Sequence, residues 1–209
     1  MSETLLDLIR GRVSVESFDP SRSLAESEIK DLVADAVTAP SSFNIQHWRF
    51  LAVRRPADKA LLREAAFGQA QVAEAAVTFV VLGDVRGMDK LPAILERAVA
   101  DGSLPEPKAA AWLRMARAIY ADPAAAREEA QRSGCLAAMT LMLAAQARGL
   151  GSAALSGFDA ERVCREFAID DRYVPIMLVA VGHVALAHPS RQPRLSLDEV
   201  LAFDRGRFP

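Results

Sequence analysis

Hydrogen-bonding side chains are concentrated in one short segment of the chain. Between Ser41 and His47 stand two serines, an asparagine, a glutamine and a histidine, and the segment stops at Trp48. A plain connecting loop needs only turn residues, so this density of donors and acceptors predicts that the loop binds something. Hydroxyl and amide groups orient a bound molecule through hydrogen bonds, but they do not by themselves form an acid–base pair.

The common catalytic and nucleotide-binding motifs are missing from the sequence. It contains no GxxxxGK[ST] loop and no GxSxG elbow, and the glycines of "GLGSAALSG" follow a predicted helix instead of a strand. The histidines His47, His183 and His188 have no metal-ligand spacing among themselves or with the cysteines. The sequence therefore predicts no metal site and gives no support to hydrolase, zinc or NTPase mechanisms.

Composition bounds the class of protein. The chain has 209 residues, of which 51% are apolar, and its 25 Lys and Arg residues nearly balance its 27 Asp and Glu residues. It can bury a real core, and it carries no charge signature for nucleic acid or a membrane. The start of the chain does not match a signal peptide, and the uncharged run 134–147 is too short to span a bilayer. We expect a cytoplasmic protein in which Cys135 and Cys164 are buried thiols.

Apolar periodicity predicts the elements that must position the polar segments. Helices are predicted at 3–12, 24–38 (with Ser23 and Glu26 as a capping box), 56–76 as two short helices, 108–120, 133–151 and 159–167. Strands are predicted at 48–53, 77–84 and 174–184, with a further strand-like piece, "DEVLAF", near the end. Short strands scattered between helices indicate an α+β fold, in which a small mixed or antiparallel sheet is sandwiched by helices. We expect a single domain over 1–209.

Two regions do not fit a simple core. Residues 85–132 hold four prolines and several charges, and they predict a helical excursion that is either plain surface or a lid. Asp122 and Pro123 are typical of a helix start within that region. The tail 185–209 is rich in proline and arginine and has too few apolar groups to fold alone, so we expect it to reach a partner subunit.

Several weak signals occur together and in a fixed order: "RVSVESF" at 12–18, "APSSFNIQHWRF" at 39–50, "GLG" at 149–151, a glycine turn at 157, the strand 174–184, and Arg194 in the tail. In this order the sequence resembles the nitroreductase-like family of FMN-dependent oxidoreductases over nearly its full length. The segment 39–50 is the most specific part of the likeness. The resemblance implies a homodimer that exchanges its C-terminal tail, with FMN bound at the subunit interface.

The resemblance also implies which residues hold the flavin. Arg12, Ser14 and Arg194, with Arg191 as an alternative, match phosphate and ribityl ligands, because an arginine fork can pair with phosphate oxygens. Other positions match the wall and edge of the ring system: Pro40, Ser41, Ser42 and Asn44 from the second subunit, and Gln69, Ser156 and Gly157 from the first. Glu16 stands where the family usually has a basic or amide residue, so a carboxylate here would lower the potential of the flavin unless it points outward or pairs with an arginine.

Four residues are candidates to meet the substrate: Phe43, His47, Trp112 and Tyr120. His47 replaces a proline of the family pattern, and its alternative role is that of a strand-start residue with satisfied nitrogens. Ordinary helix packing is the alternative for Trp112 and Tyr120. Ser156 stands where some family members have glutamate, which leaves the contacts near flavin N5 open.

The function implied by the resemblance is NAD(P)H oxidation coupled to reduction of an electron-poor acceptor. Nitroaromatics, quinones and activated alkenes are the acceptor classes, and ping-pong hydride transfer through flavin N5 would need no catalytic side chain. The alternatives are a specialised dehydrogenase, dehalogenase or flavin-modifying enzyme, and a flavin-binding protein or structural dimer without turnover. The sequence does not choose between NADH and NADPH.

Overall fold

The computed structural model describes residues 4–185 and 191–206. His188 and part of the predicted tail therefore lie outside the described residues. The long helices are α1 (Leu5–Gly11), α2 (Glu26–Ala36), α3 (Pro56–Ala65), α5 (Leu91–Ala100), α6 (Glu106–Ile119), α7 (Pro123–Ala147) and α8 (Ala160–Glu166). Shorter turns of helix are η1 (Ser42–Asn44), α4 (Ala70–Glu74), η2 (Gly87–Lys90) and α9 (Leu197–Val200). The strands are β1 (Trp48–Val53), β2 (Val77–Asp84), β3 (Gly151–Leu155) and β4 (Tyr173–Gly182).

The four strands form one antiparallel sheet in the order β1-β2-β4-β3. In the register of the sheet, Trp48 lies opposite Gly83, and Gly151 lies opposite Gly182. Every residue of the central strand β2 is buried, as its continuous apolar sequence predicts for a strand that is covered on both faces. The predicted strands 48–53 and 77–84 are confirmed with unchanged bounds.

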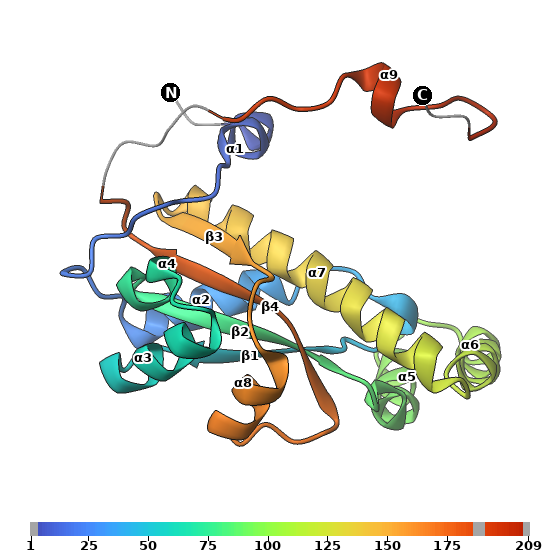
Figure 1. The fold of residues 1–209 in the computed structure, drawn as a ribbon. Helices are drawn as coiled ribbons and strands as arrows, with labels where there is room; N and C mark the ends of the chain where they lie inside the picture. Colours follow the sequence, from blue (N-terminus) through green and yellow to red (C-terminus); the bar gives the residue numbers. More distant parts are fainter. Residues whose placement is uncertain (1–3, 186–190, 207–209) are drawn as a thin grey trace.

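Helices cover both faces of the sheet (Figure 1). On one face Leu32 of α2 and Leu141 of α7 pack against Phe79 of β2. On the other face Leu62 of α3, Val72 of α4 and Val163 of α8 pack against Val80 and Leu178. The predicted α+β sandwich is confirmed, and the sheet is antiparallel throughout.

The longest helix, α7, joins two segments that the sequence analysis treats separately. The Asp122 carboxylate accepts the Ala124 N–H at 2.9 Å, and the helix then runs for 25 residues to Ala147. It ends where Gly149 adopts a φ of +70°, a conformation that glycine adopts without steric cost. The last ten residues of the excursion 85–132 are therefore part of the central helix, and only η2, α5 and α6 project from the body.

Four local predictions were wrong. Residues Gly151–Leu155 form strand β3, whereas Gly151 was expected to be only a helix stop. The strand-like "DEVLAF" contains the short helix α9, because the Glu199 carboxylate accepts the Ser196 N–H and starts a helical turn. Helix α2 begins after Ala25 and not after Ser23, since Glu28 accepts the Ala25 N–H at 2.7 Å. Cys135 is exposed and Cys164 half-buried, and both are free thiols.

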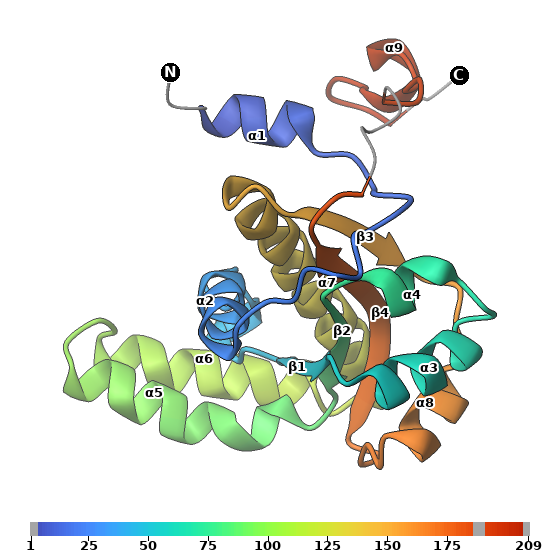
Figure 2. The same cartoon turned by 90° about the vertical axis from the view of Figure 1, so that its left-hand side faces the viewer.

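Two different parts of the molecule lie at opposite ends of α7 (Figures 1 and 2). At one end the arm, defined here as residues 87–120 with η2, α5 and α6, builds its own small core around Leu91, Leu95 and Ala116. At the other end α1 and the tail lie beyond the β3 edge of the sheet. Within residues 4–185 and 191–206, no helix is long and apolar enough to cross a lipid bilayer.

Candidate functional site

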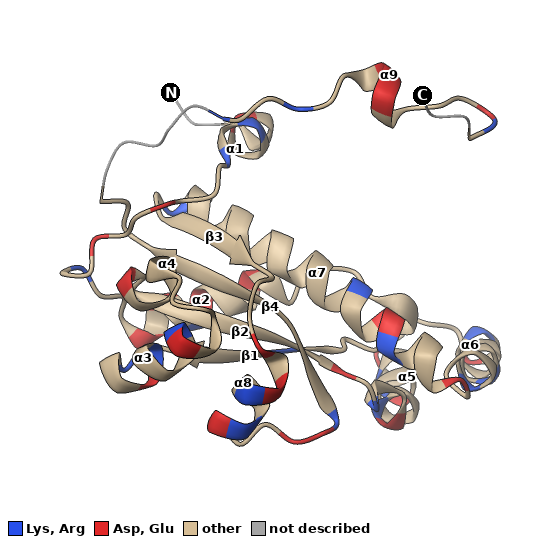
Figure 3. Ribbon diagram, in the orientation of Figure 1, with Lys and Arg blue, Asp and Glu red and all other residues tan. Residues whose placement is uncertain are grey.

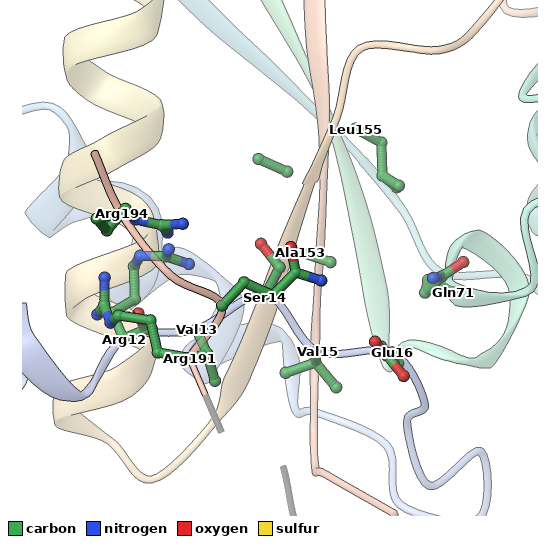
Figure 4. Close-up of a pocket in the computed structure, with 12 residues that line it drawn as sticks. Arg12, Val13, Ser14, Val15, Glu16, Gln71, Ala153, Leu155, Arg191 and Arg194 are labelled. Carbon is green, nitrogen blue, oxygen red and sulfur yellow. The ribbon is translucent and has the colours of Figure 1, made fainter. Parts of the chain in front are cut away.

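A cavity of about 260 Å³ lies at the β3 edge of the sheet (Figure 4). Its walls are the segment 12–16, the strand residues 153–155, Gln71, and the tail residues Arg191, Gln192 and Arg194. Five of the predicted cofactor residues meet here: Arg12, Ser14, Glu16, Arg191 and Arg194. They come from sequence positions that lie up to 182 residues apart, and the fold brings them to one place.

The segment 12–16 is held against the edge strand β3. Ser14 forms a parallel bridge with Ser152, and the Val15 N–H donates to the Ser152 carbonyl at 3.0 Å. Successive side chains of an extended segment point to opposite sides. Val15 is buried, whereas Ser14 and Glu16 are exposed and line the cavity. The alternation in "RVSVESF" therefore places its polar members toward the cavity.

Three guanidinium groups converge at one end of this cavity, and we call Arg12, Arg191 and Arg194 the arginine end (Figure 4). The Arg191 guanidinium donates to the carbonyl oxygens of Arg10 and Arg12, each at 2.6 Å, so the tail crosses the C-terminal end of α1. Burial lowers the pKa of Arg12, and repulsion from Arg191 and Arg194 lowers it further. A bound anion would relieve this repulsion, so the donor set fits a phosphate group.

The opposite end of the cavity has a different character. Glu16 and Gln71 lie there, away from the arginine end (Figure 4). A molecule that spans the cavity would therefore meet cations at one end and a carboxylate with an amide at the other. Gln69, the residue before α4, was predicted from the sequence, but Gln71, two positions further on and inside α4, was not, because it belongs to no motif.

Gln69 and Gly157 form a second group of predicted residues. The Gln69 side-chain amide donates to the carbonyl oxygens of Gly157 at 2.7 Å and of Ala66 at 3.0 Å. Ser156 and Gly157 directly follow Leu155, which lines the cavity, so this group continues the same edge of the sheet. The amide N–H groups of Gln69 are engaged by the protein, which leaves its carbonyl oxygen as the group that can accept from a ligand.

The loop 40–47 lies at the end of the molecule opposite the β3 edge. It carries the remaining predicted cofactor residues: Pro40, Ser41, Ser42 and Asn44. This loop has an unusual backbone, because Phe43, Asn44 and Gln46 have φ values of +51°, +57° and +58°. Each left-handed non-glycine residue costs on the order of 1 kcal/mol. The Ser41 hydroxyl accepts the Gln46 N–H at 2.9 Å, and the Gln46 amide donates to Asn44, which closes the loop on itself.

Two of the four substrate candidates, Phe43 and His47, belong to this loop, and the other two, Trp112 and Tyr120, belong to the arm and contact it. The rings of Phe43 and Trp112 meet edge to face with centroids 5.9 Å apart, and the rings of His47 and Tyr120 stack at 5.6 Å. His47 is 0% exposed, and both of its ring nitrogens have hydrogen-bond partners. The structure therefore does not place His47 in contact with a substrate, and it fits the alternative of a satisfied residue at the start of β1.

One chain does not bring all the predicted residues together. The arginine end, Glu16 and the 156–157 turn lie at the β3 edge, whereas the loop 40–47 and the arm lie at the far end of α7 (Figures 1 and 2). Within the described residues 4–185 and 191–206, no group of three or more His, Cys, Asp or Glu side chains is arranged to hold a metal ion.

Comparison with known proteins agrees with the geometry. A family model described as the nitroreductase family matches residues 9–183. YodC of Bacillus subtilis, whose name assigns it to the NAD(P)H nitroreductases, is 32% identical over 91% of this chain and 95% of its own. The CLA biosynthesis enone reductase of Lactiplantibacillus plantarum is 30% identical over 88% of each chain.

A solved structure extends the likeness to three dimensions. A nitroreductase-type protein of Exiguobacterium sibiricum, solved in complex with FMN, superimposes with a TM-score of 0.87 at 28% identity. The match covers 96% of this chain and 97% of that one. The matched segment 9–183 contains Arg12, Ser14 and the loop 40–47, so the likeness includes most of the candidate site. This chain belongs to the nitroreductase family.

Proposed function

We propose that the chain is an FMN-dependent NAD(P)H oxidoreductase that reduces electron-poor small molecules. The observation that carries the proposal is the arginine end: three guanidinium groups meet at one end of the cavity, where burial lowers the pKa of Arg12 and repulsion from Arg191 and Arg194 lowers it further. A family member of the same fold binds FMN, whose phosphate is an anion of the required kind.

The polar residues of the cavity would determine which end of FMN lies at which end of the cavity. Arg12, Arg191 and Arg194 would hold the phosphate, and Ser14 would bond the ribityl chain. Glu16, Gln71 and the turn 156–157 would then lie toward the ring system. Hydroxyl, amide and backbone N–H groups can be fixed in advance around a ring whose charge changes, which stabilises one redox state relative to the other.

The flavin, when bound, supplies hydride transfer, and the protein supplies binding and orientation. This division of labour accounts for the lack of an acid–base pair among the polar residues of the site. Relatives named for nitro reduction and for enone reduction support nitroaromatics and activated alkenes as acceptors, and quinones share their electron-poor character. Donor and acceptor would occupy the same space in turn, which is ping-pong kinetics.

We also propose that the active form is a homodimer. The cavity of one chain, about 260 Å³, is below the range of about 300–1,000 Å³ that is usual for small-molecule sites, and a second chain that supplied a further wall would enlarge it. The loop 40–47 carries the other cofactor residues and lies too far away to supply that wall to its own cavity. The loop of a second subunit can do so.

Apolar surface supports the same assembly. The C-terminal part of α7, residues 133–147, carries no charged residue (Figure 3), and Leu136 and Met139 are exposed on it. Leu5 and Leu6 of α1, and Leu197 and Phe203 of the tail, are more than half exposed. Adjacent apolar patches of this kind mark protein interfaces. An exchanged tail would cover them and would carry Arg191 and Arg194 toward the interface.

The proposal is tested with purified protein. We expect a yellow dimer whose flavin absorbance is bleached by NADH or NADPH without oxygen and returns when a nitroaromatic, quinone or enone is added. Colourless protein that takes up no added FMN would refute the flavin assignment. A yellow protein that neither nucleotide bleaches would favour a flavin-binding protein without turnover, and bleaching without re-oxidation by these acceptors would favour a specialised enzyme of the family.

A further inference from the structure

His47 is buried in a single hydrogen-bonding arrangement. Its Nδ1 lies 2.8 Å from the Asp84 carbonyl oxygen, and its Nε2 lies 3.2 Å from the Tyr120 phenol oxygen. A carbonyl oxygen can only accept, so the proton of the neutral ring sits on Nδ1. Nε2 is then an acceptor, and the Tyr120 hydroxyl donates to it. The three groups form a chain of bonds with one direction, from Tyr120 through His47 to Asp84.

Asp84, at one end of this row of hydrogen bonds, is itself held in place by several hydrogen bonds. The Asp84 N–H donates to the His47 carbonyl at 2.8 Å, and its carboxylate accepts two bonds from Arg172, at 2.7 and 2.9 Å. Burial alone would raise the pKa of Asp84, but Arg172 and Lys90 outweigh that effect and lower the pKa. Space for the imidazole ring depends on Gly87, because a Cβ there would lie 2.5 Å from Nδ1.

The Tyr120 end belongs to the arm. Tyr120 follows the last residue of α6, and its N–H closes that helix on the Ala116 carbonyl at 2.8 Å. The loop 40–47 also touches the arm through Ile45, which is 1% exposed and packs with Leu91 and Leu95, and through the contact of Phe43 with Trp112. The arm, the loop and the end of the sheet therefore meet at the ring of His47.

Three left-handed residues make the loop costly to maintain. Phe43, Asn44 and Gln46 would relax toward other conformations unless contacts outside the loop restrained them. His47 follows these residues directly and is fixed on one side by Asp84 and on the other by Tyr120. Its hydrogen bonds are placed to keep the strained loop and the arm in one arrangement.

We propose that His47 and Tyr120 are positioning residues that lock the arm onto the loop 40–47, and that the lock requires the neutral form of His47. Protonated His47 would carry a hydrogen on Nε2, so the Tyr120 hydroxyl would have to accept instead of donate, and the buried ring would hold a positive charge that burial disfavours. The consequence for catalysis, that the lock holds Ser41, Ser42 and Asn44 in the geometry offered to FMN, rests on the function proposed above. The lock itself is a property of the protein alone.

Burial and the charged groups around the ring act on the pKa of His47 in opposite directions. Burial lowers the pKa of His47, while Asp84 and Glu129 of α7 oppose that shift and Arg49 of β1 adds to it. An arm that opens would return His47 to water and to a pKa of about 6.5. The opened state then binds more protons than the closed state as pH falls below about 6.5, so opening becomes easier by up to about tenfold per pH unit.

Amide hydrogen exchange of the full chain tests the proposal. In the wild-type protein, the segments 41–47 and 87–120 should lose protection together below pH 6.5, after correction for intrinsic rates, while β2 stays protected. Y120F removes only the donor to Nε2 and should raise exchange in both segments about tenfold at neutral pH. H47N keeps a donor near the position of Nδ1, and it should raise exchange and abolish the pH dependence.

Y173F is the matched control, because Tyr173 is the one other tyrosine of the sequence; it pairs with Asp84 in the sheet, but in the described part of the chain its hydroxyl bonds neither the loop nor the arm. It should leave both segments as in the wild type. Unchanged protection in Y120F, release of only one of the two segments, or a wild-type pH dependence in H47N would each overturn the lock. Since exchange is measured without turnover, a protein that binds no FMN but behaves as expected here would refute the proposed function and leave the lock standing.

Discussion

The two ends of the chain use their polar groups in opposite ways. At the β3 edge, three arginines approach one another and repel, and the cavity beside them holds the exposed carboxylate of Glu16, which forms no ion pair with residues 4–185 or 191–206. In the loop 40–47 and the arm, the Ser41 hydroxyl, the Gln46 amide and both nitrogens of His47 are bonded within the protein. The β3 edge can therefore bind a ligand, whereas the polar groups of the loop 40–47 and the arm already bond within the protein.

This difference distinguishes polar groups that can bind a ligand from polar groups that hold the backbone in position. Polar groups that repel or stay exposed gain free energy when a complementary molecule arrives, so they mark where the ligand is held. Groups that are already satisfied gain nothing from it, and they fix the shape of whatever carries them. A homodimer would bring the two kinds together, with the β3 edge of one subunit facing the loop 40–47 of the other.

The largest effect is expected from a substitution that prevents two subunits from associating, so that the β3 edge of one subunit cannot meet the loop 40–47 of the other. L136E places a carboxylate in the uncharged C-terminal part of α7, where burial of an unpaired charge at an interface would cost several kcal/mol. We expect the dimer dissociation constant to rise by at least about hundredfold and FMN to be lost with it, as measured by light scattering and absorbance. M115E, at a position of α6 that is 56% exposed against 47% for Leu136, should leave the dimer intact. An L136E dimer of wild-type affinity would show that this face of α7 is not the interface.

Removing one cation from the arginine end should weaken binding without altering the fold. A hydrogen bond to a charged group contributes about 1.5–3 kcal/mol, so R12A should lower FMN affinity by about 10- to 100-fold in a fluorescence titration. R165A changes an exposed arginine of α8 and should bind FMN as the wild type does. Equal affinities for the two variants would mean that the three arginines do not hold the phosphate.

In the loop 40–47 and the arm, the expected effect is on stability. G87A puts a Cβ 2.5 Å from the His47 ring, and overpacking of this kind costs about 1–3 kcal/mol. Urea unfolding should show that loss, with G157A as a control, since its Cβ would meet only the Gln69 amide at 3.6 Å and should cost less than about 0.5 kcal/mol. A G87A protein as stable as the wild type would mean that the His47 ring is not held tightly.

The same contrast explains what could be predicted from the sequence. The strands 48–53 and 77–84 are rich in apolar residues, so local pattern was enough to predict both strands with their bounds. Strand β3 was missed because "GSAAL" consists of small residues that carry little strand signal. The contact between His47 and Tyr120 joins positions 73 residues apart, and no local periodicity encodes such a pair.

The smallest expected effect, and the sharpest test of the β3 edge, concerns Glu16. Its carboxylate lines the cavity opposite the arginine end, toward the proposed ring system, and would oppose negative charge on a reduced flavin. E16Q should therefore raise the midpoint potential of bound FMN by about 30 mV, which for two electrons equals about 1.4 kcal/mol. E161Q, on the exposed surface of α8, should leave the potential unchanged. An unchanged potential in E16Q with normal FMN affinity would place Glu16 away from the ring, and Gln71 would then be the polar group that faces it.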